Sequence, residues 1–176
     1  FKRKEEILEE IKRWASERYT NGRVKVYLNK LDRRGRGVKG VYLTVLGTCA
    51  DDSDSGQVGR GNRVNGIIPL NRPISSEAAA GKNPVSHIGK IYNVLTYKIA
   101  DRIYREISGL KEVYVWLLSH IGEPIDKPRV AAIQVIPEKG LKIKTIREPI
   151  EAIIMDELDH IQDFCLSLAK GLISIC

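Results

Sequence analysis

The longest regular pattern in this chain is a series of apolar residues at helical spacing that follows Pro84. Its members recur at every third or fourth position, and they are Ile88, Ile91, Leu95, Ile99, Ile103 and Ile107. The spacing predicts one helix of about six turns with a single apolar stripe, and Pro84 suits its first turn. A stripe of this length has to pack against other elements, so the chain must form a layered domain around a core.

Shorter patterns on both sides of this helix predict two more helices and four strands. The helical patterns cover residues 5–18 and 149–168, and the strand patterns cover residues 24–28, 41–45, 112–118 and 129–136. The predicted order of elements is therefore αββαββα. This order indicates an α+β fold in which helices pack on one face of mixed or antiparallel sheets.

The charge of the chain is unevenly distributed. Lys and Arg number 29 against 22 Asp and Glu, which gives a formal net charge of +7. Residues 1–50 carry 13 basic and 6 acidic side chains, whereas residues 151–176 carry 1 basic and 5 acidic. The local basic excess favours a polyanionic partner such as a nucleotide or a nucleic acid. With 43% hydrophobic residues the chain buries a core, which excludes disorder as a description of the whole.

The cysteines and the apolar runs bear on the cellular setting. Cys49, Cys165 and Cys176 show no CxxC spacing, so neither a disulfide framework nor a zinc site is supported. No run approaches the roughly 18 apolar residues of a membrane helix. We therefore expect a reduced, cytoplasmic setting without a membrane. The chain starts at Phe1 without an initiator Met and enters a predicted helix almost at once, so we expect a piece of a longer protein.

A glycine-rich polar segment covers residues 51–66, where no periodic pattern remains. Its glycines allow a ligand to approach the backbone closely, and Arg60 and Arg63 offer forked donors for phosphate oxygens. The aspartates at its start are ligands that Mg²⁺ accepts. The composition thus suits a polyphosphate site, and a solvated surface loop is the alternative interpretation.

A second polar segment covers residues 77–90 (EAAAGKNPVSHIGK) and leads into the long predicted helix. Free amides and the positive end of the helix dipole attract anions at such a place, and Lys82 adds a full charge. The segment is not a Walker A loop, because Ser76 replaces its first glycine and Asn83 replaces its Ser or Thr. His87 either donates to a phosphate or caps the helix.

Two other functional classes are open to the sequence. The basic residues 33–39 and the GVKG spelling of residues 37–40 suggest a single-stranded RNA-binding α+β module. That GxxG lies between two predicted strands, whereas a KH domain places it between helices, so a charged hairpin tip is the preferred interpretation. A hydrolase with a side-chain nucleophile is disfavoured, because no Ser/His/Asp or Cys/His arrangement can be assembled.

Two segments carry a family resemblance. Residues 56–66 (GQVGRGNRVNG) and 77–93 (EAAAGKNPVSHIGKIYN) resemble archaeal-type S-adenosylmethionine synthetase, also called methionine adenosyltransferase. The resemblance continues through residues 109–115, 119–125 and 133–137. Members of this family are longer than this chain, and residues 1–176 resemble their C-terminal part. The N-terminal portion of the family, which supplies a His/Asp pair and further ligands, is absent.

The resemblance implies an activity, cofactors and partners. ATP and L-methionine would give S-adenosylmethionine with release of phosphate and diphosphate, supported by Mg²⁺ and K⁺. The attack of a thioether on C5′ needs no general base, which agrees with the lack of a nucleophile-base pair. The family architecture implies three α+β domains with pseudo-threefold symmetry, in a homodimer with active sites at the subunit interface and no nucleic-acid or membrane partner. The 176 residues alone are expected to be inactive.

The resemblance also assigns roles to residues. Lys82 matches the lysine of the family's Gly-Lys segment and Arg63 the arginine of its glycine-rich segment, so both are expected to be catalytic. The residues expected to bind ATP or its triphosphate are Gly59, Arg60, Gly61, Arg63, Gly81, Lys82, His87 and Lys90. Where the bacterial branch has Gly-Asp, this chain has Gly56 and Gln57. The substrate or metal acid is therefore expected at Asp54 or Gln57, with Asp54 as the candidate metal ligand.

Overall fold

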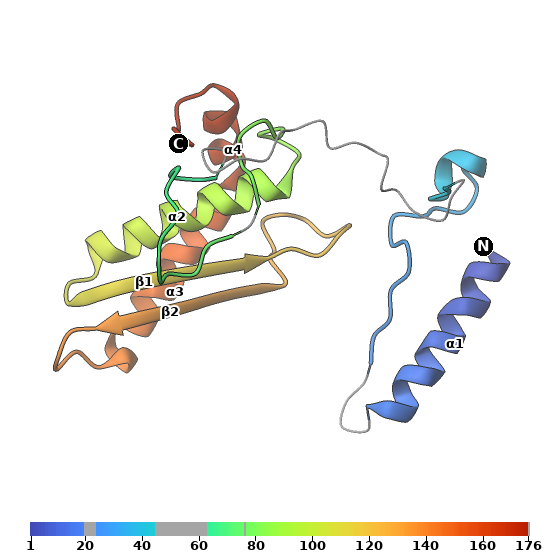
Figure 1. Ribbon diagram of the computed structural model, residues 1–176, viewed down its shortest axis with the longest axis horizontal. Helices are drawn as coiled ribbons and strands as arrows, with labels where there is room; N and C mark the ends of the chain where they lie inside the picture. The colour runs from blue at the N-terminus through green and yellow to red at the C-terminus, as the bar shows by residue number, and fades with distance from the viewer. Residues whose placement is uncertain (20–23, 45–62, 76, 176) are drawn as a thin grey trace. The chain divides into compact units, whose positions relative to one another are not determined.

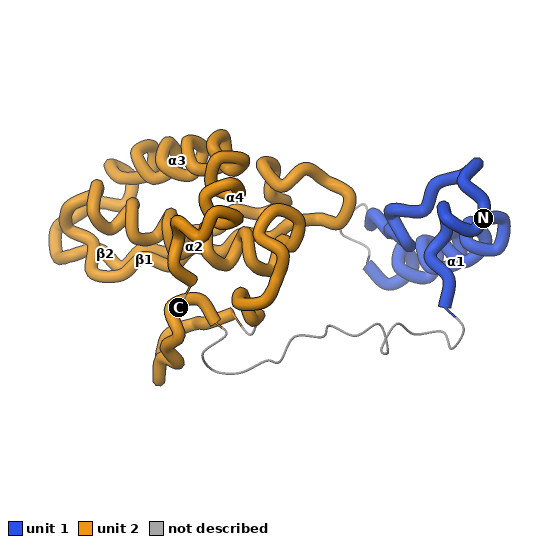
Figure 2. Tube along the Cα trace, turned by 90° about the horizontal axis from the view of Figure 1, so that it is seen from above, with its two compact units in different colours: residues 1–53 blue, residues 54–176 orange. Residues whose placement is uncertain are grey.

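The structure is a computed structural model that describes residues 1–19, 24–44, 63–75 and 77–175 (Figure 1). The chain divides into two compact units, residues 1–53 and residues 54–176 (Figure 2). The candidate functional residues that the structure describes belong to the second unit. Each unit is described by itself.

The first unit consists of helix α1 (Lys2–Arg18) and a short 3-10 helix η1 (Gly37–Gly40) with the segment that joins them. Asp32 links the two: its Oδ2 lies 2.9 Å from Lys4 Nζ on α1, and its Oδ1 accepts a hydrogen bond of 2.9 Å from the Tyr42 N–H. The bond from the Tyr42 amide holds the pKa of the Asp32 carboxyl below its usual value. Asp32 therefore joins α1 to the segment that follows η1. Among the described apolar side chains of this unit, Ala15 is buried.

The strands predicted over residues 24–28 and 41–45 are wrong for the residues that the structure describes, since neither 24–28 nor 41–44 is a strand. Alternating apolar residues give an extended segment one apolar and one polar face, but a strand also needs a neighbouring strand for its backbone hydrogen bonds. Between the two predicted strands the backbone bonds locally: the Arg33 N–H donates to the Gly40 carbonyl at 2.7 Å. The basic residues 33–36 are accordingly part of a turn that leads into η1, and not the tip of a hairpin.

The second unit is built around the long predicted helix. Its elements are α2 (Ile88–Glu106), β1 (Leu110–Leu118), β2 (Val130–Pro137), α3 (Ile143–Asp159) and α4 (Ile161–Ala169). The predicted stripe of α2 lies at the centre of the core, where Ile91, Leu95, Ile99 and Ile103 are at most 1% exposed. The prediction of this helix and of both following strands is confirmed.

Strands β1 and β2 form an antiparallel two-stranded sheet in which Val113 pairs with Val135 and Val115 with Ile133. These four side chains pack against the hydrophobic core that the helices supply. On the other face Trp116 is 41% exposed. The described helices therefore cover only one face of this sheet, and the described elements form an α+β unit, as predicted.

The helix predicted over residues 149–168 is two helices, because α3 ends at Asp159 and α4 begins at Ile161. Helix α3 also begins at Ile143, so Pro149 lies inside it and not in its first turn. Proline removes a backbone donor from a helix. The burial of Ile146, which is 6% exposed, explains why the helix nevertheless extends beyond the proline.

An ion-pair network joins α2 to α3. The Glu157 carboxylate is 4% exposed on α3, and its two oxygens lie 3.1 Å from Arg102 Nη1 and 2.6 Å from Lys98 Nζ on α2. Arg102 also pairs with Asp156. Because a buried carboxylate needs compensation, this network fixes the position of α3 along α2.

Candidate functional site

The chain enters α2 through a turn that contains Gly81 and Asn83. Gly81 has a φ of +79°, which favours glycine. The Asn83 Oδ1 accepts hydrogen bonds from the N–H groups of Val85 and Ser86, at 2.9 and 3.1 Å. This side-chain turn occupies the place of a first helical turn, so α2 begins at Ile88 and the expected start at Pro84 is wrong.

His87 caps α2. Its Nδ1 accepts a hydrogen bond of 3.0 Å from the Gly89 N–H, one of the amides that a helix start leaves without a partner. Since Nδ1 accepts, the proton of the neutral ring is on Nε2. The structure thus confirms the cap, one of the two roles considered for His87.

Lys82 and Glu77 form an ion pair at this turn. The Lys82 Nζ lies 2.8 Å from the Glu77 Oε1, and the Lys82 side chain is 15% exposed. A Cβ added to Gly89 would lie 2.9 Å from the same Glu77 oxygen and 2.9 Å from the His87 ring. The carboxylate and the imidazole therefore both lie against the first turn of α2, and Gly89 leaves the space for them.

Lys90 lies in the same first turn and is only 7% exposed. Among the described residues no ion pair of this side chain is found, and its Nζ is not one of the buried nitrogens that lack a hydrogen-bond partner. Lysine is rarely buried without a partner, because a desolvated charge without compensation is costly. An anion at this turn would give the ammonium group of this largely buried side chain a partner of opposite charge.

Arg63 lies in the second unit within the glycine-rich segment, next to Val64, which belongs to the core. Its Nε is buried and has no hydrogen-bond partner among the described residues. Within that same part of the chain, no hydrogen bond or ion pair connects Arg63 to Lys82, His87 or Lys90. The structure thus gathers Lys82, His87 and Lys90 around one turn and leaves Arg63 without a demonstrated link to them.

The other predicted site residues lie outside the described residues: Asp54, Gln57, Gly59, Arg60 and Gly61. In the described ranges no group of three or more His, Cys, Asp and Glu side chains is placed to hold a metal ion. Within those ranges there is also no helix with the length and apolar character needed to cross a membrane.

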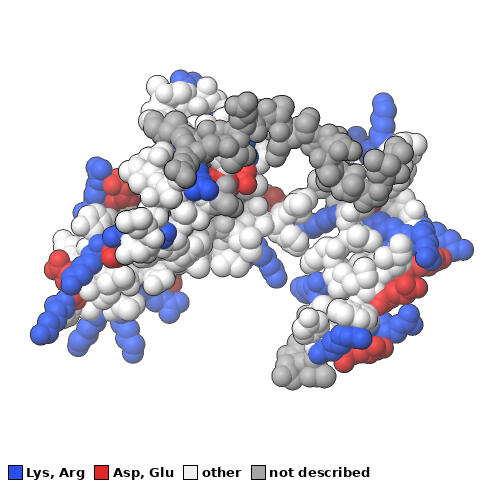
Figure 3. Space-filling view, viewed as in Figure 1, with Lys and Arg blue, Asp and Glu red and all other residues white. Residues whose placement is uncertain are grey.

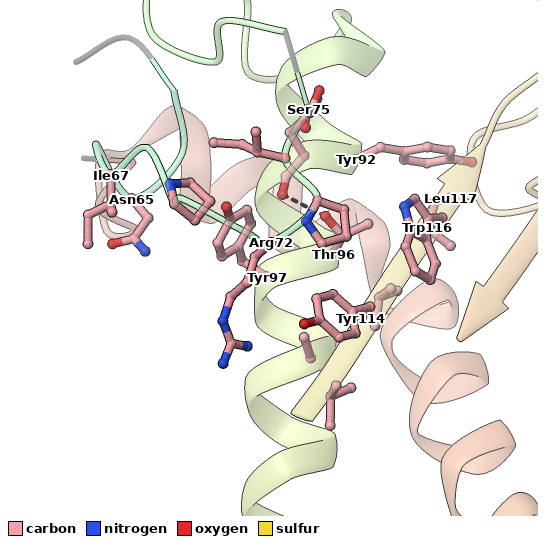
Figure 4. Close-up of a pocket in the computed structure, with 17 residues that line it drawn as sticks. Asn65, Ile67, Arg72, Ser75, Tyr92, Thr96, Tyr97, Tyr114, Trp116 and Leu117 are labelled. Atoms are coloured by element: carbon pink, nitrogen blue, oxygen red, sulfur yellow. Dashed lines mark hydrogen bonds between the residues drawn. The ribbon is translucent and has the colours of Figure 1, made fainter. Parts of the chain in front are cut away.

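Sequence reasoning missed two features of this unit. Glu77 is not among the predicted site residues, because a single acid before a Gly-Lys turn has no specific spacing. The other feature is a cavity of about 610 Å³ between residues 65–75, α2 and β1 (Figure 4). Its walls come from three distant segments, which no local pattern connects.

Four aromatic side chains line this cavity: Tyr92, Tyr97, Tyr114 and Trp116 (Figure 4). Tyr114 stacks on Trp116 with 6.0 Å between ring centroids, and its hydroxyl bonds to Glu112, which raises the Tyr114 pKa. Burial raises the pKa of Tyr92, whose hydroxyl donates to the Ile125 carbonyl at 2.7 Å. Arg63, Lys82, His87 and Lys90 do not line the cavity. The cavity is therefore separate from the turn at the start of α2 that carries the last three of these residues.

Together the fold and the turn define an α+β protein in which Lys82 and Lys90 lie near the start of α2, a kind of position that suits an anion. The family model described as S-adenosylmethionine synthetase (AdoMet synthetase) matches residues 1–172. The chain belongs to this family.

Curated relatives agree with this assignment. The chain is 50% identical to the S-adenosylmethionine synthase of Thermococcus onnurineus over 169 residues, which cover 94% of this chain and 41% of the relative. It is 49% identical to that of Hyperthermus butylicus over 175 residues, 98% of this chain and 42% of the relative. The chain thus spans about two-fifths of the length of these relatives.

Proposed function

We propose that this chain is part of a methionine adenosyltransferase, which converts ATP and L-methionine into S-adenosylmethionine and releases phosphate and diphosphate. The observation that carries the proposal is the start of the 19-residue helix α2, with Lys82 in the turn that precedes it and Lys90 in its first turn. The names of the relatives supply the reaction.

The reaction needs alignment and charge stabilisation. The methionine sulfur attacks C5′ of ATP, the S–C bond forms as the bond from C5′ to the triphosphate oxygen breaks, and the triphosphate leaves with the electron pair. Negative charge then accumulates on the leaving group. Lys82 and the α2 dipole are suited to stabilise that charge, because their interaction with it strengthens during bond breaking. One water then hydrolyses a P–O–P bond of the triphosphate and gives phosphate and diphosphate.

Mg²⁺ and K⁺ are the proposed cofactors. Mg²⁺ binds oxygen ligands and usually keeps several waters or phosphate oxygens in its shell. The described part of the turn offers one carboxylate, Glu77, so triphosphate oxygens would supply most of the ligands. Asp54, which the structure does not describe, remains the proposed protein ligand. Mg²⁺ would neutralise charge on the phosphates.

The wider setting is also a proposal. The family resemblance supports a cytoplasmic homodimer with active sites at the subunit interface and three domains with pseudo-threefold symmetry. The turn at α2 supplies only part of a triphosphate site, and residues that act as a unit fail together. We therefore propose that the 176 residues alone do not catalyse the reaction.

A chimaera tests this function. In it, this chain replaces the matching 169 residues of the Thermococcus onnurineus synthase. We expect the chimaera to form S-adenosylmethionine from ATP and methionine with Mg²⁺ and K⁺, and the 176-residue chain to form none. A folded chimaera without product would contradict the proposed function, and turnover by the isolated chain would contradict its expected inactivity.

The same chimaera tests the roles of Lys82 and Arg63. Each contributes a charge-assisted contact to the leaving triphosphate, so Lys82→Ala and Arg63→Ala should each lower kcat about 30- to 1000-fold. The KM for methionine should change much less. Steady-state kinetics with ATP and methionine varied separately measure both. Normal kcat with a raised methionine KM would assign these residues to the other substrate.

A single-stranded RNA-binding module is the second candidate, which the basic excess of residues 1–50 favours. Two of the basic side chains are already engaged within this unit, because Lys4 pairs with Asp32 and Arg34 with Glu5. Over the unit that carries α1, Figure 3 shows acidic side chains next to basic ones. RNA binding at physiological salt that is lost in Arg33→Ala and Arg36→Ala would favour this candidate.

A further inference from the structure

We propose that Glu77 is a positioning residue that holds the Lys82 ammonium in place for the leaving triphosphate. The inference rests on the proposed function and adds a residue to it. Glu77 is an acidic residue in a turn where we expect an anion to bind, so its charge there needs an explanation. The Glu77 carboxylate lies 2.8 Å from Lys82 Nζ, so the lysine expected to bind phosphate already has an internal counter-ion.

The carboxylate of Glu77, whose side chain is 43% exposed, lies close to Gly89 at the start of α2. A Cβ at Gly89 would approach the Glu77 Oε1 to 2.9 Å, a distance that real Cβ atoms do not reach. Glycine at this position therefore lets the carboxylate lie against the first turn of α2. A negative charge there is favourable, because the dipole of the helix is positive at that end.

The ion pair has two opposite consequences for a triphosphate. An ammonium group has three donors, and Glu77 engages one of them and thereby fixes the direction of the others. This pre-organisation favours the transition state, in which charge develops on the leaving oxygen. The same carboxylate repels a bound polyanion. Glu77 therefore weakens binding of the ground state and supports turnover.

The inference predicts changes of opposite sign in Glu77→Gln, which keeps the shape of the side chain and removes its charge. Titration calorimetry of the 176-residue chain with inorganic tripolyphosphate should show binding that is about 3- to 10-fold tighter. In the chimaera, kcat should fall about 10-fold while the KM for ATP stays or falls. Glu77→Asp keeps the charge, so it should keep the affinity of the unaltered chain and an intermediate kcat.

Glu106→Gln is the matched control. Glu106 lies at the other end of α2 and pairs with Arg102 at 2.7 Å, so the variant removes the same charge from an ion pair of the same helix. Its affinity for tripolyphosphate and its kcat should equal those of the unaltered protein. Thermal unfolding of each variant shows whether the fold is retained.

The outcomes separate this inference from the proposed function. If Glu77→Gln weakens binding and turnover in parallel, Glu77 only supports the fold, and the inference is overturned. Unchanged affinity and kcat in that variant would overturn it as well, while an active unaltered chimaera would leave the proposed function standing. Neither binding nor turnover in the unaltered proteins would overturn both.

Discussion

Lys90 is held in the first turn of α2 with only 7% of its surface exposed and without an ion-pair partner among the described residues. Lys98, further along the same helix, has the opposite setting: it is half-exposed and lies 2.6 Å from Glu157. Two lysines of one helix therefore differ in whether an acidic side chain of the described residues pairs with them. The difference marks Lys90 as the side chain that a bound anion would stabilise.

Substitution of Lys90 by methionine should separate binding from stability. Methionine preserves most of the packing volume and removes the charge from a largely buried side chain, so the free energy of unfolding should be unchanged or higher. Affinity for tripolyphosphate should fall about 10-fold or more, the value of one charge-assisted hydrogen bond. Urea unfolding and titration calorimetry measure the two quantities.

Lys98→Met is the control for that substitution. It leaves the buried Glu157 with fewer partners, so stability should fall while tripolyphosphate affinity is retained. If Lys90→Met behaved in the same way as Lys98→Met, Lys90 would be a structural residue and not a ligand for anions.

Among the elements, the junction of α3 and α4 contains a titrating group. His160 follows α3 and precedes Ile161, and its Nδ1 lies 2.8 Å from the Asp156 carbonyl oxygen. The bond to that carbonyl, with the carboxylates of Asp156, Asp163 and Asp159, raises the pKa of His160 above its usual value. The protonated ring is thus favoured at the C-terminal end of α3.

This shift makes stability depend on pH. Because the folded pKa of His160 is above the unfolded value, its contribution is fully present below about pH 6.5 and is lost as the pH rises through the folded pKa. We expect the unfolding temperature to fall from about pH 6 toward about pH 8, and His160→Gln to reduce the slope. Calorimetric scans across this range provide the measurement. An equal slope in both proteins would assign the dependence to other groups.

At the scale of the molecule, the fold leaves exposed apolar side chains on the face of the β1–β2 sheet that the described helices do not cover. Leu118 is 57% exposed and pairs with Val130, which is 46% exposed, and Trp116 lies two residues before Leu118 on the same face. Apolar side chains in such a cluster favour association with another protein surface. The two-stranded sheet β1–β2 thus provides apolar area that the described helices leave uncovered.

The isolated 176-residue chain should therefore self-associate. We expect sedimentation to show a concentration-dependent dimer, and the double variant Trp116→Ser/Leu118→Ser to shift it toward the monomer without loss of helical structure. The matched control is Leu166 on α4, which is 53% exposed and lies outside the sheet, so Leu166→Ser should leave the association unchanged. A chain that stays monomeric at the highest concentration reached would contradict this expectation.

The sequence by itself determined the features that depend on local periodicity. The apolar stripe of α2 could be predicted from the spacing of its residues, because a period of three to four residues decides which side chains face the core. Strands β1 and β2 appeared from short apolar runs between turns, and the turn at Lys82 from its glycine, its lysine and the family resemblance. For these features, the residues that carry the pattern are neighbours in the chain.

Only the tertiary structure decided the rest. Residues 24–28 have the alternation of a strand, yet strand formation requires a partner that the local sequence does not specify. The extension of α3 beyond Pro149 depended on the burial of Ile146, and the pairing of Glu77 with Lys82 depended on the space at Gly89. The aromatic cavity required three segments to meet. In each case the deciding contact joins groups whose proximity arises only when the chain is folded.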